Sequence, residues 1–252
     1  MSGPFGASQW MYDASSGFYP TVLEDSLKFN NDESQYLSWT PATAGNRKTW
    51  TWSGWVKRGN LGTTQTLFIT QTLSPNSYQY LLLNTSNQLE HRFVSSGTEY
   101  HKTTTNAVYR DSSAWYHVVL QFDSTQSTAS DRDKIYINGE RQTLVTTTQI
   151  SQNVDGLINY NIEHRIGESV ATGVLFDGYL ANVCFIDGQA LDPTSFGEYD
   201  GTLWRPKSDA DIQSLTFGTN GFYLPFKQTT EAEGFSTVTY TCLLYTSPSP
   251  RD

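Results

Sequence analysis

Short apolar runs separated by turn residues recur along this chain, and no stretch shows the 3.6-residue period of an amphipathic helix. Between residues 50 and 57, Trp55 points to one face of an extended strand. The opposite face of that strand carries Trp50, Trp52, Gly54 and Val56. Aromatic residues make up 14% of the 252 residues, and they favour strands over helices. This pattern predicts an all-β fold in which two antiparallel sheets pack as a jelly-roll sandwich.

A hairpin is predicted where residues 78–83 and 88–93 flank the turn 84–87. If Leu83 pairs with Gln88, the faces of the hairpin follow from the period of two. The face toward the core then carries Tyr78, Tyr80, Leu82, Leu89, His91 and Phe93. The amphipathic outer face carries Gln79, Leu81, Leu83, Gln88, Glu90 and Arg92.

Other local patterns add detail to this sandwich. The nearly continuous apolar run 114–123 suits a central strand that is covered on both sides. Asn138 and Gly139 form the pair that a type I′ hairpin turn requires. Residues 191–196 are expected to form a short helical turn, and Cys184 is expected to be a small buried side chain.

Charge and hydropathy exclude some classes of partner. The net charge is -9, and an acidic surface repels phosphate backbones, so nucleic acid is not expected as a partner. No apolar stretch is long enough to cross a bilayer, so membrane insertion is not expected either. The first ten residues lack the charged and apolar regions of a signal peptide.

The chain divides into four parts by composition. Residues 1–25 are expected to be an N-terminal arm or lead-in, and residues 26–227 the sandwich. Residues 228–241 are interpreted as a linker and the start of a truncated second domain. Residues 242–252 resemble the in-frame translation of a sequencing adapter, which would make this segment, including Cys242, an artefact.

Several runs occur in an order that is typical of one superfamily. They are Ser53-Gly54-Trp55-Val56-Lys57, Trp115-Tyr116-His117-Val118-Val119, Lys134-Ile135-Tyr136-Ile137-Asn138-Gly139, Ile166-Gly167, Phe176-Asp177-Gly178-Tyr179-Leu180-Ala181-Asn182-Val183, and Ile186-Asp187-Gly188-Gln189-Ala190-Leu191-Asp192. Together, over roughly residues 26–200, they resemble the laminin G-like branch of the concanavalin A-like lectin and glucanase superfamily. The resemblance implies a sandwich that binds ligands, and it is more specific for fold than for ligand.

A narrower resemblance concerns residues 46–55 and 185–191. These segments resemble tail-fibre and other virion appendage proteins of marine bacteriophages. The resemblance implies a virion location, with an extracellular location as the alternative. It further implies a host-surface glycan and other virion proteins as partners, and a homo-oligomer as one form of assembly.

The superfamily also contains glucanases, whose Glu-x-Asp-x-x-Glu motif places two carboxyl groups about 5–5.5 Å apart. Glu198 and Asp200 begin such a motif, but Leu203 stands where the second Glu would be needed. The domain is therefore expected to be a non-catalytic module. A structural oligomerisation domain and a secreted glycan-degrading enzyme are the alternatives.

Two sets of residues are candidates for ligand binding. Asp123, Asp131 and Asp133 bracket one loop and are calcium candidates, because calcium prefers several oxygen ligands. A solvated hairpin loop is the alternative interpretation, and no cofactor is required. The glycan-binding candidates are Gln79, Glu90 and Arg92, because sugars need polar contacts beside apolar ones. The alternative interpretation of these three residues is the solvated outer face of a sheet. None of the four histidines has metal-ligand spacing, and His117 is expected to be a hydrogen-bonded structural residue.

Overall fold

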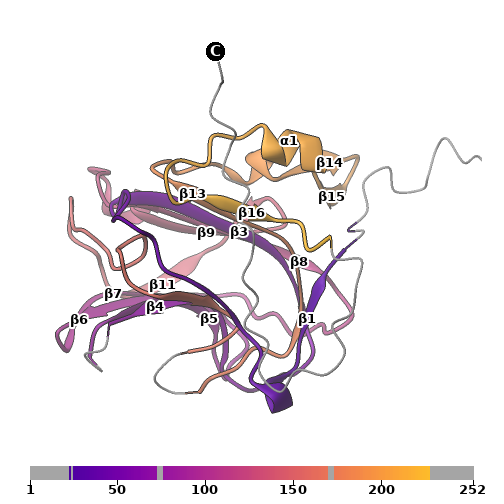
Figure 1. Cartoon of the computed structure of the whole chain (residues 1–252), viewed down its shortest axis with the longest axis horizontal. Coiled ribbons are helices and arrows are strands. Elements are labelled where there is room, and N and C mark those ends of the chain that lie inside the picture. Colours follow the sequence, from indigo (N-terminus) through magenta and orange to yellow (C-terminus); the bar gives the residue numbers. More distant parts are fainter. Residues whose placement is uncertain (1–22, 24, 73–75, 170–172, 228–252) are drawn as a thin grey trace, which may run out of the picture.

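The computed structural model describes residues 23, 25–72, 76–169 and 173–227. Within these residues, two seven-stranded antiparallel sheets pack face to face (Figure 1). The first sheet contains β1 (Leu27–Phe29), β13 (Gly178–Asp187), β3 (Thr49–Arg58), β8 (Tyr116–Asp123), β9 (Asp133–Ile137) and β10 (Glu140–Arg141) in that order, with β16 (Phe222–Leu224) beside β13. The second contains β11 (Leu144–Thr148), β7 (Thr98–Thr105), β6 (Leu89–Ser95), β5 (Tyr78–Leu83), β4 (Gln65–Gln71), β12 (His164–Ile166) and β2 (Leu37–Trp39). The predicted all-β sandwich is confirmed.

The core between the sheets is rich in aromatic rings. Trp50 and Trp52 have 0% exposure, and they lie on the predicted inner face of β3. The ring of Trp50 stacks on Phe122 with centroids 5.0 Å apart, and Trp52 stacks on Phe68 at 6.2 Å. Truncating a buried ring of this size to Ala typically costs about 3–5 kcal/mol. These rings therefore stabilise the contact between β3, β8 and β4.

A further layer covers the outer face of the first sheet (Figure 1). It consists of the 3-10 turn η4 (Pro193–Ser195), the hairpin of β14 (Gly197–Asp200) and β15 (Leu203–Pro206), and the helix α1 (Asp209–Gln213). We call it the C-terminal layer. Under it lie Val119, the small buried Cys184 and Ile186, so β8 is covered on both sides as predicted. The five-residue α1 was not predicted, because it is too short to show a helical period.

The turn between β9 and β10 has the predicted form. Asn138 and Gly139 have φ angles of 50° and 82°, as a type I′ turn requires. A β-carbon on Gly139 would lie 2.6 Å from the ring of Trp204 in the C-terminal layer. Glycine is therefore needed here both for the backbone conformation and for the close approach of that ring.

The hairpin of β5 and β6 forms, but the predicted register is wrong by one residue. Leu83 pairs with Leu89 instead of Gln88. The turn holds one residue more than expected, because Asn87 is left-handed (φ 63°) and Asn84 N donates to the Gln88 carbonyl at 2.9 Å. A shift of one residue exchanges the two faces of a strand. The core-facing residues of β5 are therefore Gln79, Leu81 and Leu83, whereas Tyr78, Tyr80 and Leu82 face outward.

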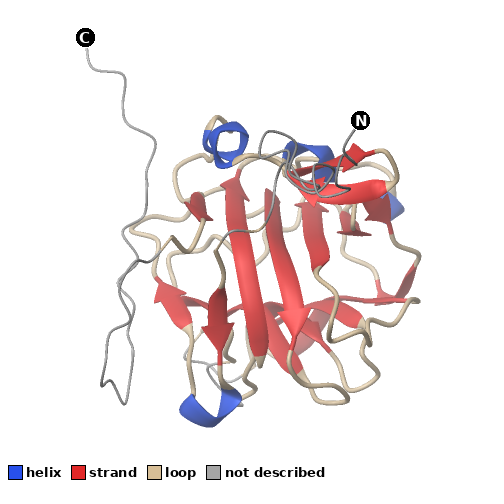
Figure 2. Ribbon diagram, turned by 90° about the vertical axis from the view of Figure 1, so that its right-hand side faces the viewer, coloured by secondary structure: helices blue, strands red, loops and turns tan. Residues whose placement is uncertain are grey.

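Short helical segments, among them η2 (Asn31–Glu33) and η3 (Ala129–Asp131), lie around a body of strands (Figure 2). In the part of the chain that the structure describes, no helix has the length and apolar character needed to cross a membrane. The predicted linker 228–241, the adapter-like segment 242–252 and almost all of the predicted arm 1–25 lie outside the described residues.

Candidate functional site

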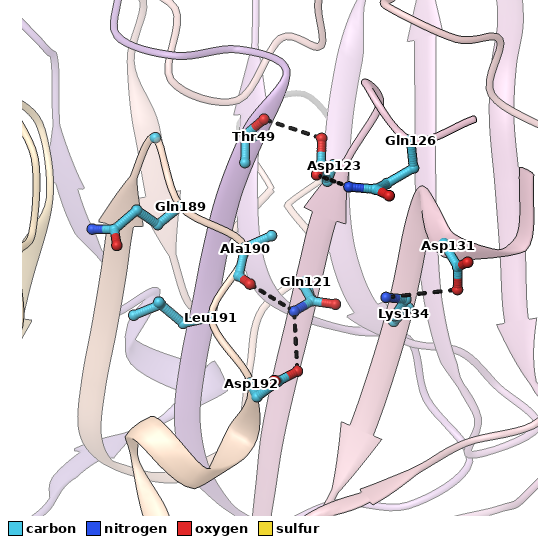
Figure 3. Close-up of a pocket in the computed structure, with 11 residues that line it drawn as sticks. Thr49, Gln121, Asp123, Gln126, Asp131, Lys134, Gln189, Ala190, Leu191 and Asp192 are labelled. Carbon is cyan, nitrogen blue, oxygen red and sulfur yellow. Dashed lines mark hydrogen bonds and ion pairs between the residues drawn. The ribbon is translucent and has the colours of Figure 1, made fainter. Parts of the chain in front are cut away.

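A polar pocket with a volume of about 590 Å³ lies on the outer face of the first sheet, beside the C-terminal layer (Figure 3). Its walls come from β3, β8, β9, η3 and the loop after β13. The lining residues are Thr49, Gln121, Asp123, Gln126, Asp131, Lys134, Gly188, Gln189, Ala190, Leu191 and Asp192. Small-ligand sites usually measure about 300–1,000 Å³, so the pocket has the size of a ligand site.

Strand alternation places these side chains outside the core. Leu120 and Phe122 of β8 face the other sheet, so Gln121 and Asp123 point outward. The loop after β13 is held over them by Thr51, whose hydroxyl donates to the Gln189 carbonyl and accepts from Leu191 N, both at 2.8 Å. The pocket thus joins residues that are far apart in the sequence.

Asp123 is nearly buried, with 8% exposure, but protein groups donate several hydrogen bonds to its carboxylate. Its oxygens accept hydrogen bonds from Thr49 Oγ1 at 3.2 Å, Thr125 Oγ1 at 2.6 Å and Gln126 Nε2 at 2.6 Å. Burial by itself would raise the pKa of Asp123, but these hydrogen bonds outweigh it and lower the pKa below its ordinary value. Asp123 is therefore ionised at neutral pH.

The other charged groups of the pocket are partly paired. Asp131 lies 3.6 Å from Lys134 Nζ and 3.4 Å from Arg141 Nη1. Asp192 is exposed and accepts one long hydrogen bond, 3.4 Å, from Gln121 Nε2. Asp192 thus carries the carboxylate that is most available to a ligand.

The structure does not bring the predicted calcium ligands together. Asp123 and Asp131 line the pocket, but Asp133 lies at a position of β9 that faces the core. In the described residues, three ligand atoms from His, Cys, Asp or Glu side chains come within 4.8 Å of one another only in a cluster of Asp133 with two histidines. The pocket carboxylates therefore do not fit a preformed calcium site. Asp123 and Asp133 stand at the two ends of the loop, and strand alternation points their side chains to opposite faces of the first sheet.

The cluster around Asp133 joins the two sheets through the core. Asp133 Oδ1 lies 2.9 Å from His91 Nδ1 on β6, and Oδ2 lies 2.8 Å from His101 Nε2 on β7. Burial would raise the pKa of Asp133, but the two histidines outweigh burial and hold the pKa well below its ordinary value. Sequence spacing gave no sign of this cluster, because the two histidines lie on different strands.

Gln79 decides whether the cluster suits a metal or a proton. Its Oε1 accepts from the backbone N–H groups of Leu157 and Ile158, at 2.7 and 3.0 Å, so its Nε2 must face His91 Nε2 at 3.1 Å. His91 Nε2 is therefore an acceptor, and Nδ1 carries the proton shared with Asp133. A metal on Nδ1 would move that proton to Nε2, where it would meet the Gln79 donor. The cluster therefore fits a structural hydrogen-bond network between the two sheets and not a metal centre.

The predicted glycan-binding residues are also separated. Gln79 has 0% exposure, so its prediction as a surface residue is wrong, and the register shift of the hairpin is the reason. Glu90 and Arg92 lie on the outer face of the second sheet, where Glu90 accepts from Tyr80 Oη at 2.8 Å and Arg92 Nε donates to Glu99 at 2.7 Å. That face lies on the opposite side of the sandwich from the pocket.

A buried serine and histidine pair resembles a nucleophile with its base, but its proton is in the wrong place. Ser53 Oγ lies 2.9 Å from His117 Nε2, and Trp204 Nε1 donates to His117 Nδ1 at 2.9 Å. Because indole N–H is only a donor, Nδ1 must accept, and Nε2 carries the proton toward Ser53. A general base needs a free Nε2. The predicted structural role of His117 is confirmed.

Glu198 and Asp200 are engaged in surface ion pairs on the β14–β15 hairpin. Arg205 lies 2.9 Å from Glu198 and 3.6 Å from Asp200. Both acids extend from the C-terminal layer, outside the pocket lining. They therefore have the surroundings of ordinary surface acids, as expected from the incomplete motif.

The sequence matches a known protein family over most of the sandwich. A laminin G-type family model of the concanavalin A-like lectin/glucanases superfamily matches residues 31–195, more than half of the chain. The chain belongs to this superfamily. Among curated proteins, no sequence matches it.

Two solved structures illustrate the superfamily fold. A Bacteroides ovatus protein assigned to carbohydrate binding has 15% identity and a TM-score of 0.50, over 82% of this chain and 53% of that protein. This chain therefore spans about half the length of that protein. The heptameric SAP-like pentraxin of Limulus polyphemus has 14% identity and a TM-score of 0.51, over 81% of this chain and 94% of the pentraxin chain. At these identities, the similarity concerns the fold alone.

Proposed function

We propose that this domain binds carbohydrate without catalysis, and that its binding site is the polar pocket on the outer face of the first sheet. The observation that carries the proposal is the pocket lining, where amide and carboxylate side chains meet the apolar Leu191. Sugars present hydroxyl groups beside apolar C–H faces, and such a mixture of groups suits both. The Bacteroides ovatus protein with the same fold is itself assigned to carbohydrate binding.

The state of two candidate bases, His117 and Glu198, supports the non-catalytic part. His117 donates to Ser53, and Glu198 is paired with Arg205, so neither is set up to move a proton for a substrate. Release of reducing ends from a polysaccharide by the purified protein would contradict this part and favour a secreted glycan-degrading enzyme.

We further propose that the domain belongs to a phage virion appendage and binds a glycan on the host surface. The resemblance of residues 46–55 and 185–191 to virion appendage proteins supports this proposal. Antibodies raised against the domain should label the tails of purified particles, where other virion proteins would be its partners. Trimers or other oligomers that bind no glycan would favour a purely structural virion domain.

A glycan array with the full chain tests the binding site. Asp192→Arg places a long cation in the pocket from an exposed position, and Asp192 makes no side-chain capping bond that the change would remove. Binding should fall at least tenfold, or about 1.4 kcal/mol. Asp32→Arg, an equal charge change at an exposed residue of η2, is the matched control and should bind normally.

Two results would count against the proposal. Unchanged binding of Asp192→Arg would place the site elsewhere, with the face of Glu90 and Arg92 as the next candidate. A complete lack of glycan binding by the unchanged chain would remove the carbohydrate function. Binding should be equal with and without calcium, because the pocket carboxylates do not converge on a shared position.

A further inference from the structure

The orientation of three glutamine amides determines what the pocket offers to a ligand. Gln121 Nε2 donates to the Ala190 carbonyl at 2.8 Å, and Gln189 Nε2 donates to the Thr216 carbonyl at 2.8 Å. Gln126 Nε2 donates to the ionised Asp123 at 2.6 Å. Each of these acceptors lacks a proton, so each amide nitrogen is fixed in place by its partner. Gln121 Nε2 also reaches Asp192 Oδ1 at 3.4 Å, so both of its N–H groups point to protein acceptors, whereas Gln126 and Gln189 each use one N–H group within the protein.

The amide oxygens remain for the ligand. Within the described residues, the Oε1 atoms of Gln121, Gln126 and Gln189 have no hydrogen-bond partner. Gln121 matters most, because only 5% of it is exposed and its Oε1 lies on the side of the pocket that faces Lys134 (Figure 3). This oxygen is open to the pocket, so a ligand that brings a donor to it would form a hydrogen bond at a position that the fixed amide defines.

The charges of the lining act in the same direction. Three carboxylates, those of Asp123, Asp131 and Asp192, line the pocket with a single ammonium group, Lys134. Lys134 is already paired with Asp131 at 3.6 Å. A bound anion would lie beside carboxylates and hydrogen-bond acceptors, which is unfavourable. A hydroxyl or ammonium group could donate hydrogen bonds to the same carboxylates and amide oxygens.

Resting on the proposed function, we infer that the pocket selects glycans by their donors. It takes sugars that present hydroxyl or ammonium groups, and it rejects sugars that carry carboxylate, sulfate or phosphate. The acidic net charge of -9 adds repulsion of anionic polysaccharides at longer range.

The test compares oligosaccharides matched in length but different in charge on the same array. Neutral N-acetylglucosamine oligomers, cationic glucosamine oligomers and anionic galacturonate oligomers are placed beside a broad panel of neutral, amino, uronate and sulfated glycans. Among glycans whose binding is lost in Asp192→Arg, neutral and amino sugars should bind at least tenfold more tightly than anionic ones. Higher salt should weaken the cationic ligands and leave neutral ones nearly unchanged.

Asp192→Asn then tests the cause of the selection. This change removes one charge and adds donors, so binding of amino sugars should fall about tenfold and the rejection of uronates should be relieved. Asp32→Asn is the matched control and should change neither. Anionic glycans among the pocket-dependent ligands would overturn the selection rule and leave carbohydrate binding intact. No binding of any glycan would overturn the proposed function itself.

Discussion

Acidification from pH 7 to pH 5 should destabilise this domain through its buried neutral histidines. His164 Nε2 accepts from Asn159 N at 2.9 Å and Nδ1 donates to the Ile162 carbonyl at 2.8 Å, so this ring is neutral. His117 is neutral because it accepts from Trp204. In both rings, an added proton would face a donor.

The magnitude follows from the shifted pKa values. Burial lowers the pKa of His117 from 6.5 to about 3 and that of His164 from 6.5 to about 4. Below pH 6.5 the unfolded chain binds protons that the folded chain does not, so stability falls until the folded pKa values are reached. Each histidine costs roughly 1.4 kcal/mol per pH unit, which is about 2 kcal/mol each at pH 5 and about 4 kcal/mol together. Burial also lowers the pKa of His91, which adds to the loss.

Urea unfolding at both pH values, followed by tryptophan fluorescence, measures this difference. In His117→Asn, the amide oxygen can still accept from Trp204, and the loss between pH 7 and pH 5 should shrink by about 2 kcal/mol. His164→Asn should shrink it by a similar amount and serves as an independent variant if the first folds poorly. A free energy of unfolding that is equal at pH 7 and pH 5 would refute the assignment of neutral buried rings.

Three further predictions concern the core and the absence of a metal. Asp133→Asn should lower the free energy of unfolding by about 1–3 kcal/mol in urea, because the amide has one acceptor oxygen where the carboxylate has one for each of His91 and His101, and an unchanged free energy of unfolding would contradict this role. Leu81→Ala should cost about 2–5 kcal/mol, whereas Tyr80→Ala on the outer face should cost clearly less, and the reverse order would restore the originally predicted register. Calcium should leave the thermal midpoint unchanged, since a ligand stabilises only a site that it binds, and an upward shift would show a calcium site in this domain.

Local features of the fold were predictable because they depend on neighbours in the sequence. Alternation alone placed Trp50 and Trp52 in the core, and Asn138 and Gly139 alone specified their turn. The hairpin of β5 and β6 shows the limit of this reasoning. A single left-handed residue, Asn87, lengthens the turn by one position and reverses the faces of a whole strand.

The candidate site depends on contacts that sequence spacing does not reveal. Gln121 and Ala190 are 69 positions apart, and the pairing of β3 with both β8 and β13 is what brings them together. Acidic residues near one loop suggested calcium, but Asp123 and Asp133 occupy positions of opposite orientation. The run 186–192 was noticed only as part of a family resemblance, and its role as a pocket wall emerged from the fold.

The hydrogen bonds of the buried histidines differ from those of the pocket amide in what they leave free for a ligand. His117 and His91 have their ring nitrogens held by Trp204 and Gln79, which fixes the proton on each ring and removes the free base that catalysis needs. In the pocket, by contrast, Gln121 is held at its nitrogen and left open at its oxygen. Under the proposed function, this oxygen would accept a hydrogen bond from the ligand at a position that the fixed amide defines. The chemistry of this domain therefore favours recognition at the pocket over reaction in the core.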